Sequence, residues 1–348
     1  MSEILELAKV GQTLTRVRRT TDDSVTAGRI DSLESFDVDG ATQWVLLRGN
    51  SRSRRVLLIV QQGPGLPLIH EARAFERRLH LEADAVVAYW DQRGTGKSLS
   101  ADPSTINLAQ LVADVRAMVD ALCARLQVDR VDIVGFSLGA TLATMAAAAD
   151  PTRIGRVVAV GIDVDFAESE RYAYAFACDE AARRGNGRAQ RQLEAIGAPP
   201  HDTSKRFLTR VRWVTTYGGI RRDQGFIGML WENVWRLLAS PHYSFAEAVR
   251  ALRAIEGTQG RMLAHLQHFD LRAIVSRVEV PIAFFQGRHD FATPPELVAR
   301  YVDTLEAPRG KSLVWFEDSA HMPHYEEPAR FRAALLRALD IAPCATSR

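Results

Sequence analysis

Long hydrophobic runs, cysteines and a net charge of one sign are all scarce in this sequence. No stretch approaches the roughly 18 apolar residues of a membrane-spanning helix, and the N-terminal MSEILELAKVGQ lacks the apolar run of a signal peptide. Three cysteines, an odd number without C-x-x-C or metal-ligand spacing, are widely separated: Cys123, Cys178 and Cys344. The 44 lysines and arginines nearly balance the 42 aspartates and glutamates. We therefore expect a cytoplasmic protein with reduced thiols, no metal, and neither nucleic acid nor a membrane as partner.

Apolar runs of strand length alternate with amphipathic segments of helix length along most of the 348 residues. This rhythm predicts an α/β fold with a mostly parallel sheet flanked by helices. The Asp39-Gly40 dipeptide indicates a hairpin near the start. The expected strands are 30–38, 43–48, 55–60, 85–90, 131–134, 156–160, 281–285 and 311–316, and the main expected helices are 69–79, 108–126 and 328–339, with a short amphipathic helix possible at 4–10.

The alternation stops at about residue 164 and resumes at about residue 270. The intervening segment is helical in composition, without a buried-strand run, and contains three of the six tryptophans. We expect a helical cap, inserted after the sixth strand, that covers the site and forms the substrate pocket. The predicted organisation is a first core part at 1–163, the cap at 164–270 and a second core part at 271–348.

The segment Gly135–Gly139, of sequence G-F-S-L-G, separates an apolar strand from an Ala-rich helix. This is the G-x-S-x-G pattern of the nucleophile elbow of α/β-hydrolases. A strand that turns into a helix within a few residues brings two backbones close together, so glycine is favoured on both sides of the serine. The pattern predicts that Ser137 is a nucleophile held at the carboxyl edge of the sheet. An ordinary strand-to-helix turn with a capping serine is the alternative.

A serine nucleophile needs a base, and in this fold the acid and the histidine follow it in that order at the ends of later strands. Asp290 follows the strand at 281–285, and His321 follows the strand at 311–316. We expect His321 to accept the proton of Ser137, and Asp290 to orient the imidazole. The alternatives for the base are His324 and His289, and those for the acid are Asp318 and Asp163.

An oxyanion hole needs two donors directed at one oxygen, and backbone N–H groups are suited to this. We expect one from Leu138, which follows the nucleophile, and one from Gly63 in the loop after the strand at 55–60, with Gln62 as the alternative. The run Gly94–Ser98, G-T-G-K-S, matches the end of a P-loop, but position 91 is aspartate where the P-loop needs glycine. We therefore expect no nucleotide and no other cofactor.

Together these segments resemble the proline iminopeptidase group of α/β-hydrolases. The run 91–98 is similar to that family's D-Q-R-G-x-G-x-S, 63–65 to the second half of its H-G-G-P-G loop, and 319–328 to its C-terminal histidine region. The resemblance extends over about residues 30 to 340, is specific in the core and vague in the cap. It implies a serine peptidase or esterase-type hydrolase with the triad Ser137, Asp290 and His321.

Two departures from the family concern substrate recognition. The family's His-Gly is Gln61-Gln62 here, which alters the wall beside the oxyanion hole, and its G-G-S-W-G elbow has lost the tryptophan. The family reads a free N-terminal amine with cap glutamates, and Glu232 is the candidate for that role, against a plain surface glutamate. Trp231 beside it is a candidate for the pocket wall.

We therefore expect a Ser-His-Asp hydrolase that cleaves an ester, lactone or amide of a small apolar molecule through an acyl-enzyme. The alternatives are a proline iminopeptidase, a lyase or carbon–carbon bond hydrolase with the same triad, and a non-catalytic ligand receptor on the same fold. Dehalogenases and epoxide hydrolases need aspartate where this chain has Ser137. The sequence leaves the oligomeric state open, with a homodimer as one possibility.

Overall fold

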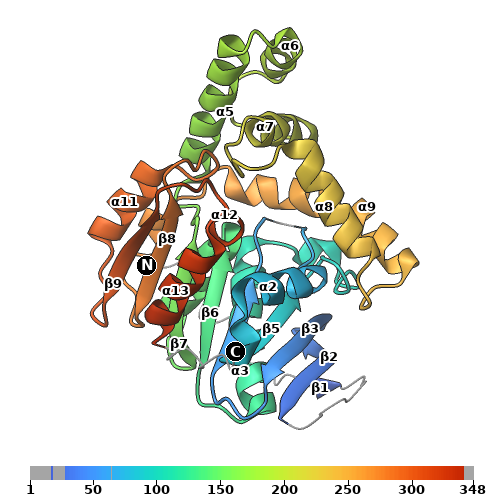
Figure 1. Ribbon diagram of the computed structural model, residues 1–348, viewed down its shortest axis with the longest axis vertical. Helices are drawn as coiled ribbons and strands as arrows, with labels where there is room; N and C mark the ends of the chain where they lie inside the picture. The colour runs from blue at the N-terminus through green and yellow to red at the C-terminus, as the bar shows by residue number, and fades with distance from the viewer. Residues whose placement is uncertain (1–16, 19–27, 64, 341–348) are drawn as a thin grey trace.

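A nine-stranded sheet organises the computed structural model, which describes residues 17–18, 28–63 and 65–340. The possible helix at 4–10, Pro64 and Cys344 lie outside these residues. The strand order is β1-β2-β3-β5-β4-β6-β7-β8-β9, antiparallel from β1 to β5 and parallel from β5 to β9. The expected mostly parallel sheet flanked by helices is confirmed (Figure 1). The strands are β1 Val17–Arg18, β2 Arg29–Val38, β3 Ala41–Asn50, β4 Val56–Val60, β5 Val86–Asp91, β6 Val131–Phe136, β7 Ile154–Val160, β8 Ile282–Gly287 and β9 Lys311–Phe316.

The central strands are apolar throughout because both faces of the sheet are covered by helices. Alternate residues of β4 pack into different clusters, Leu58 on one face and Leu57 and Ile59 on the other. One face carries α3 (Leu108–Leu126), α4 (Leu138–Ala149) and α11 (Pro295–Thr304), and the other carries α2 (Ala72–Leu79) and α13 (Pro328–Leu339). The shorter helices of the core are η1 Ile69–Glu71, η2 Leu81–Ala83, η3 Pro103–Thr105, α10 Leu271–Ile274 and α12 Pro323–Glu326.

The D-Q-R-G segment after β5 has a structural role. The buried Asp91 carboxylate accepts hydrogen bonds from the backbone N–H groups of Leu68 (2.7 Å) and Lys97 (2.8 Å). Arg93, 2% exposed, forms two hydrogen bonds of 2.7 and 2.8 Å to the fully buried carboxylate of Asp114 on α3. These interactions fix the loops on both sides of β5, at the carboxyl edge of the sheet.

Five of the six helices between β7 and β8 in the chain lie above the carboxyl ends of the strands (Figure 1). They are α5 Phe166–Arg183, α6 Gly187–Ile196, α7 Ser204–Thr216, α8 Phe226–Leu238 and α9 Phe245–Leu266. We call residues 166–266 the helical insertion. Its helices α5, α6 and α7 share a small core that contains Trp213 and Tyr217 and is separate from the two clusters on the sheet.

The helical insertion is attached to the D-Q-R-G segment through the start and middle of α9. The hydroxyl of Tyr243, just before α9, donates to Asp91, and Lys97 Nζ pairs with Glu247 at 2.7 Å. The hydroxyl of Thr258 donates to the carbonyl of Gly94 at 3.0 Å. The roof of the site is therefore connected by polar contacts to the same loop that Asp91 holds to the sheet.

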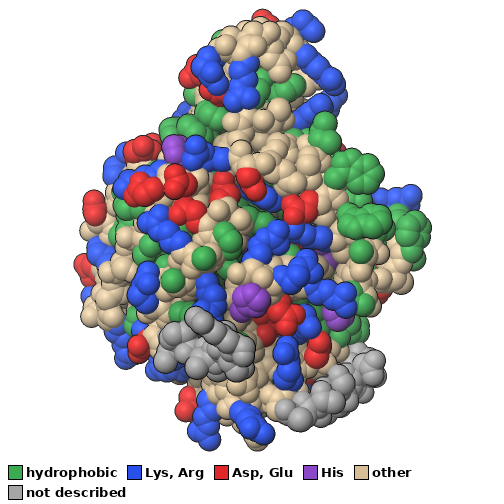
Figure 2. All heavy atoms as spheres, viewed as in Figure 1, with side chains coloured by type: hydrophobic (Ala, Val, Ile, Leu, Met, Phe, Trp, Pro, Cys, Tyr) green, Lys and Arg blue, Asp and Glu red, His purple; other side chains and the backbone are tan. Residues whose placement is uncertain are grey.

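Helix α8 is apolar on both of its faces, and its outer face is exposed. Apolar side chains gather on the surface where Figure 1 shows α8 and the start of α9 (Figure 2). Those with the largest exposure are Ile227, Leu230, Trp231, Trp235 and Phe245. Among the described residues no helix has the length and apolar character needed to cross a membrane.

Candidate active site

Ser137 occupies a strained turn between β6 and α4. Its φ of +52° and ψ of −122° fall in a region that non-glycine residues rarely adopt. A Cβ on Gly135 would lie 2.4 Å from the carbonyl oxygen of Gly139, and a Cβ on Gly139 would lie 2.3 Å from the carbonyl oxygen of Gln61. Both positions therefore exclude any larger residue, for the reason that the sequence pattern predicts.

His321 and Asp290 lie together at the ends of β9 and β8. His321 Nδ1 is 2.8 Å from Asp290 Oδ2, and both side chains are buried. The carboxylate also accepts hydrogen bonds from the backbone N–H of Ala292 (2.8 Å) and from the backbone N–H and hydroxyl of Thr293 (2.9 and 2.7 Å). Because Asp290 is held as an acceptor, it favours the tautomer with the proton on Nδ1, which leaves Nε2 as a proton acceptor.

The pKa of His321 reflects two opposed effects. Burial by itself lowers the pKa, because it disfavours the charged imidazolium. The Asp290 carboxylate favours the imidazolium through its charge and its hydrogen bond, and the pKa of His321 ends above its ordinary value. His321 packs over β7, where a Cβ on Gly161 would lie 2.9 Å from the ring. The imidazole is therefore held by close packing against the backbone at Gly161 and by the hydrogen bond to Asp290.

Ser137 and His321 line one cavity of about 320 Å³ between the sheet and the helical insertion. Leu138, Gln62 and Gly63 line it as well, beside Ser137. The insertion supplies most of the rest of the wall, which is largely apolar and includes Phe166, Phe207, Val211, Val214, Phe226 and Leu230. The arrangement suits a reaction on a mostly apolar molecule at a serine hydroxyl, with backbone N–H groups nearby.

The alternative residues occupy different places. His324 is buried against Phe136, with ring centroids 4.4 Å apart, and burial holds its pKa well below the ordinary range. His289 does not line the cavity, and Asp318 is exposed.

Asp163 does line the cavity, and its carboxyl accepts a hydrogen bond of 2.9 Å from the Ser169 hydroxyl. Burial raises the pKa of Asp163 to about 7. Two candidate acids therefore lie near His321, but it is Asp290 that forms the hydrogen bond to its ring.

Two substrate contacts expected in the helical insertion are not found as expected. Trp231 is 67% exposed on the outer face of α8 and lines neither the cavity of Ser137 nor a second one beside it. Glu232 lines only the second cavity, where its carboxylate is paired with Arg221 at 2.8 Å and with Arg236. The residue expected to read an amine is therefore already neutralised. Gln61 lines the same second cavity, and the neighbouring Gln62 lines both cavities.

Several charged groups around the site are not predicted by any pattern in the sequence. Glu170 on α5 lines the cavity and is paired with Arg210 on α7 at 2.9 Å, with both side chains buried. In the second cavity Glu71 accepts hydrogen bonds from Arg236 and Tyr325. These groups come from segments that are distant in the sequence, so residue spacing alone cannot identify the pairs. Within the described residues no cluster of three or more histidine, cysteine or acidic side chains is arranged to hold a metal ion.

Comparison with known proteins agrees with this architecture. The family model described as "alpha/beta hydrolase fold" matches residues 56–328. "Probable aminopeptidase YbaC" of Bacillus subtilis is 26% identical over 311 residues, 88% of this chain and 95% of the relative, and "Proline iminopeptidase" of Heyndrickxia coagulans is 25% identical over 323 residues, 89% and 95% of the two chains. The crystal structure of proline iminopeptidase from Mycobacterium smegmatis matches with a TM-score of 0.60 at 19% identity, over 89% of this chain and 98% of that one. The chain therefore belongs to the α/β-hydrolase fold family, with proline iminopeptidase-like proteins among its relatives.

Proposed function

We propose that this protein is a serine hydrolase that cleaves an ester, lactone or amide of a small, mostly apolar molecule through an acyl-enzyme. Ser137 is the nucleophile, His321 is the general base and acid, and Asp290 orients the imidazole. The observation that carries the proposal is the 2.8 Å contact between His321 Nδ1 and Asp290 at the rim of the cavity that Ser137 lines.

The proposed reaction begins when His321 Nε2 accepts the proton of Ser137 as the serine oxygen bonds to the substrate carbonyl carbon. The carbon–oxygen or carbon–nitrogen bond to the leaving group then breaks, and His321 returns the proton to that group. Water, deprotonated by the same imidazole, releases the acid and restores Ser137. The backbone N–H groups of Leu138 and Gly63, or of Gln62 in place of Gly63, would stabilise the oxyanion.

The substrate class follows from the walls of the cavity. An apolar wall favours an apolar acyl or alcohol part, because polar groups there would lose water without gaining partners. The helical insertion acts in this proposal as a cap over the site, corresponding to residues 164–270 between core parts 1–163 and 271–348.

A proline iminopeptidase is the second candidate, favoured by the two named relatives and by one feature of the cavity. Among the residues that the structure describes, no arginine forms a salt bridge with Asp163, and an ammonium group beside it would hold the carboxylate ionised. Against this, the three glutamates that line the two cavities, Glu71, Glu170 and Glu232, are each paired with an arginine. A free amine therefore has to rely on Asp163.

Paired hydrolysis rates distinguish the two candidates. The substrates are a proline arylamide and a panel of aryl esters and lactones of apolar acids, with Ser137→Ala as the control. We expect ester or lactone turnover that is lost in Ser137→Ala. Preference for the arylamide, abolished by Asp163→Asn, would support the iminopeptidase instead. Activity that survives Ser137→Ala would refute the serine mechanism.

A further inference from the structure

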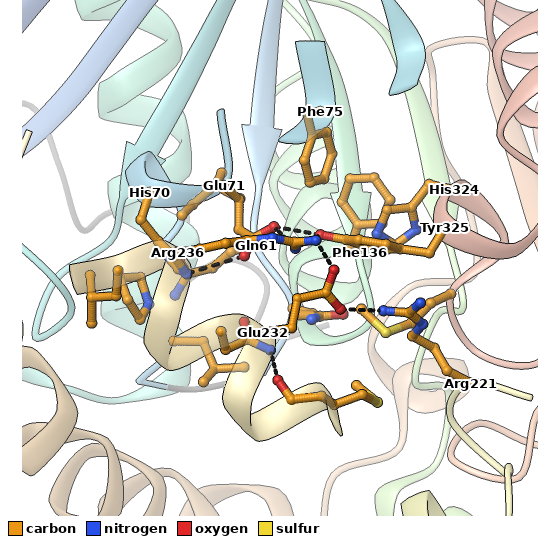
Figure 3. Close-up of a pocket in the computed structure, with 18 of the residues that line it drawn as sticks. Gln61, His70, Glu71, Phe75, Phe136, Arg221, Glu232, Arg236, His324 and Tyr325 are labelled. Atoms are coloured by element: carbon orange, nitrogen blue, oxygen red, sulfur yellow. Dashed lines mark hydrogen bonds and ion pairs between the residues drawn. The ribbon is translucent and has the colours of Figure 1, made fainter. Parts of the chain in front are cut away.

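A second, smaller cavity of about 70 Å³ adjoins the one that Ser137 lines. We call it the polar annex. Six side chains belong to both walls, so the two spaces meet between the loop after β4 and the helices α8 and α9. They are Gln62, Leu66, Met229, Asn233, Leu252 and Ile255. The annex lies between η1, the inner face of α8 and α12, and charged side chains crowd its far end (Figure 3). Its volume suits one small group of a few heavy atoms.

Gln61 is an unusual residue in the wall of the annex. Its side chain is 3% exposed, and among the described residues neither its amide oxygen nor its amide nitrogen has a hydrogen-bond partner. Figure 3 shows this amide in the middle of the labelled side chains of the cavity. A buried amide without partners costs free energy, so it calls for a ligand group that both donates and accepts. In the described part of the chain, the ring Nδ1 atoms of His70 and His324 in the same wall also have no hydrogen-bond partner.

The charges of the annex are already matched to one another. Glu71 is paired with Arg236 at 2.7 Å, and Glu232 is paired with Arg221 at 2.8 Å and also contacts Arg236. Burial alone would raise the pKa of Glu71, but His70, Arg236 and Tyr325 together lower it to about 2, so its carboxylate is ionised at neutral pH.

Two further groups complete the balance. Arg78 lies 3.6 Å from Glu232, and Asp223 pairs with Arg221 at 2.7 Å. Three arginines are thus paired with three carboxylates, and His70 Nε2 also lies 3.2 Å from Glu71 Oε1. A charged ligand group would have to break one of these pairs or be buried without a counterion, and both are costly. A neutral polar group meets neither cost.

We propose that the polar annex is a subsite for a neutral group that donates and accepts hydrogen bonds, a carboxamide, which pairs with the side chain of Gln61. This inference rests on the proposed hydrolase function and makes its substrate bipartite. The scissile carbonyl and the apolar part occupy the cavity of Ser137, and the carboxamide end extends past Gln62 into the annex. The ammonium group of an aminopeptidase substrate is disfavoured there.

Two matched series of esters test the subsite. In one, para-nitrophenyl esters have acyl chains that end in a methyl, carboxamide, carboxylate or ammonium group. In the other, butyrate esters carry the same four ends on the alcohol. We expect the carboxamide member of one series to exceed its methyl counterpart in kcat/KM by about tenfold, the effect of one or two hydrogen bonds in a buried site. The carboxylate and ammonium members should fall below it.

Gln61→Met, which keeps the length of the side chain and removes its amide, should abolish the carboxamide preference. Gln259→Met is the matched control, since Gln259 lines the cavity of Ser137 but not the annex, and it should retain the preference. Gln61→Glu keeps the shape and adds a negative charge, so it should transfer the preference to the ammonium ester. If Gln61→Met fails to fold, the preference of Gln61→Glu for the ammonium ester still tests the subsite.

The outcomes separate the subsite from the hydrolase. Esters hydrolysed in a Ser137-dependent way but ranked alike by wild type and Gln61→Met would overturn the subsite and leave the hydrolase intact. Loss of the preference in Gln259→Met alone would move the carboxamide to the larger cavity and also overturn it. Calorimetry with the same esters and Ser137→Ala measures binding at the subsite without turnover, and equal affinity for the methyl and carboxamide members would reject the subsite. Hydrolysis by Ser137→Ala would instead refute the proposed function.

Discussion

Replacement of Asp290 by asparagine is the change that tests the proposed triad most directly. Asp290 is 1% exposed and accepts hydrogen bonds from Ala292, Thr293 and the His321 ring. In Asp290→Asn, an amide oxygen that still accepts from Ala292 and Thr293 would leave the amide N–H group facing the His321 ring. This donor favours the tautomer with the proton on Nε2, which cannot accept the serine proton. We expect kcat to fall by about 10,000-fold, the size of effect found when a triad aspartate becomes its amide. This corresponds to about 5.5 kcal/mol of transition-state stabilisation.

The pH profile gives a second, independent measure of the same change. The base must be neutral to accept a proton, so activity is lost as the pH falls through the pKa of His321. That pKa is raised in the wild type because Asp290 outweighs burial. In Asp290→Asn the charge is gone and burial remains, so the acidic limb of kcat/KM should move to lower pH. An aryl ester assay over about pH 5 to pH 9 measures both kcat and the pH at which kcat/KM falls on the acidic side.

Asp163→Asn is the matched control, because Asp163 is a second aspartate near His321 and also lines the cavity of Ser137. It should reduce kcat much less than Asp290→Asn and move the acidic limb less. The free energy of unfolding of each variant, measured by thermal unfolding, should differ from that of the wild type by no more than about 3 kcal/mol, the cost of a few altered buried hydrogen bonds. A larger loss of activity in Asp163→Asn, or an unchanged limb in Asp290→Asn, would show that the acid has been assigned to the wrong residue.

Three further predictions concern stability. Gly139→Ala should destabilise the fold by about 3 kcal/mol or prevent folding, because the new Cβ would lie 2.3 Å from the backbone oxygen of Gln61; denaturant unfolding measures this, and a stable variant would contradict the contact. Asp114→Asn should cost about 3 to 5 kcal/mol, because it leaves the buried guanidinium of Arg93 without its counterion; a loss under about 1 kcal/mol in urea titration would count against that reasoning. Asp163 has a pKa of about 7 in the folded protein against an ordinary value of 3.8, so it binds its proton more tightly when folded, and the stability of the wild type should fall as the pH rises from the ordinary pKa to the raised one. Asp163→Asn should therefore be more stable than the wild type at about pH 8 but not at about pH 4. A difference in stability that does not change with pH would contradict this linkage.

Much of the core followed from the sequence because its signals are local. The helix expected at 108–126 and the strand expected at 311–316 have the predicted bounds. The hydrogen bond between His321 and Asp290 joins two residues 31 apart, yet strand order alone brought them together, since parallel strands present their carboxyl ends at one edge. The cytoplasmic location, the homodimer and the domain boundaries stay predictions.

The helical insertion was harder to interpret for two physical reasons. Helix α8 is apolar on both faces, so periodicity could not tell which tryptophans line a cavity, and Trp231 proved to be exposed. The fate of Glu232 depended on Arg221 and Arg236, and thus on how the loop before α8 folds back on that helix. A residue's local sequence does not indicate whether its charge is already compensated by another segment.

The contacts between α9 and the D-Q-R-G segment have a consequence for protein engineering. Because Tyr243, Glu247 and Thr258 bind Asp91, Lys97 and Gly94, the roof of the cavity is not an independent module. A chimera that receives the insertion of another hydrolase would need matching partners at these three positions, or the graft would lack its anchor to the sheet. Libraries that aim at new substrates are therefore better confined to the cavity-facing positions of α7 and α8, with residues 243–258 left unchanged.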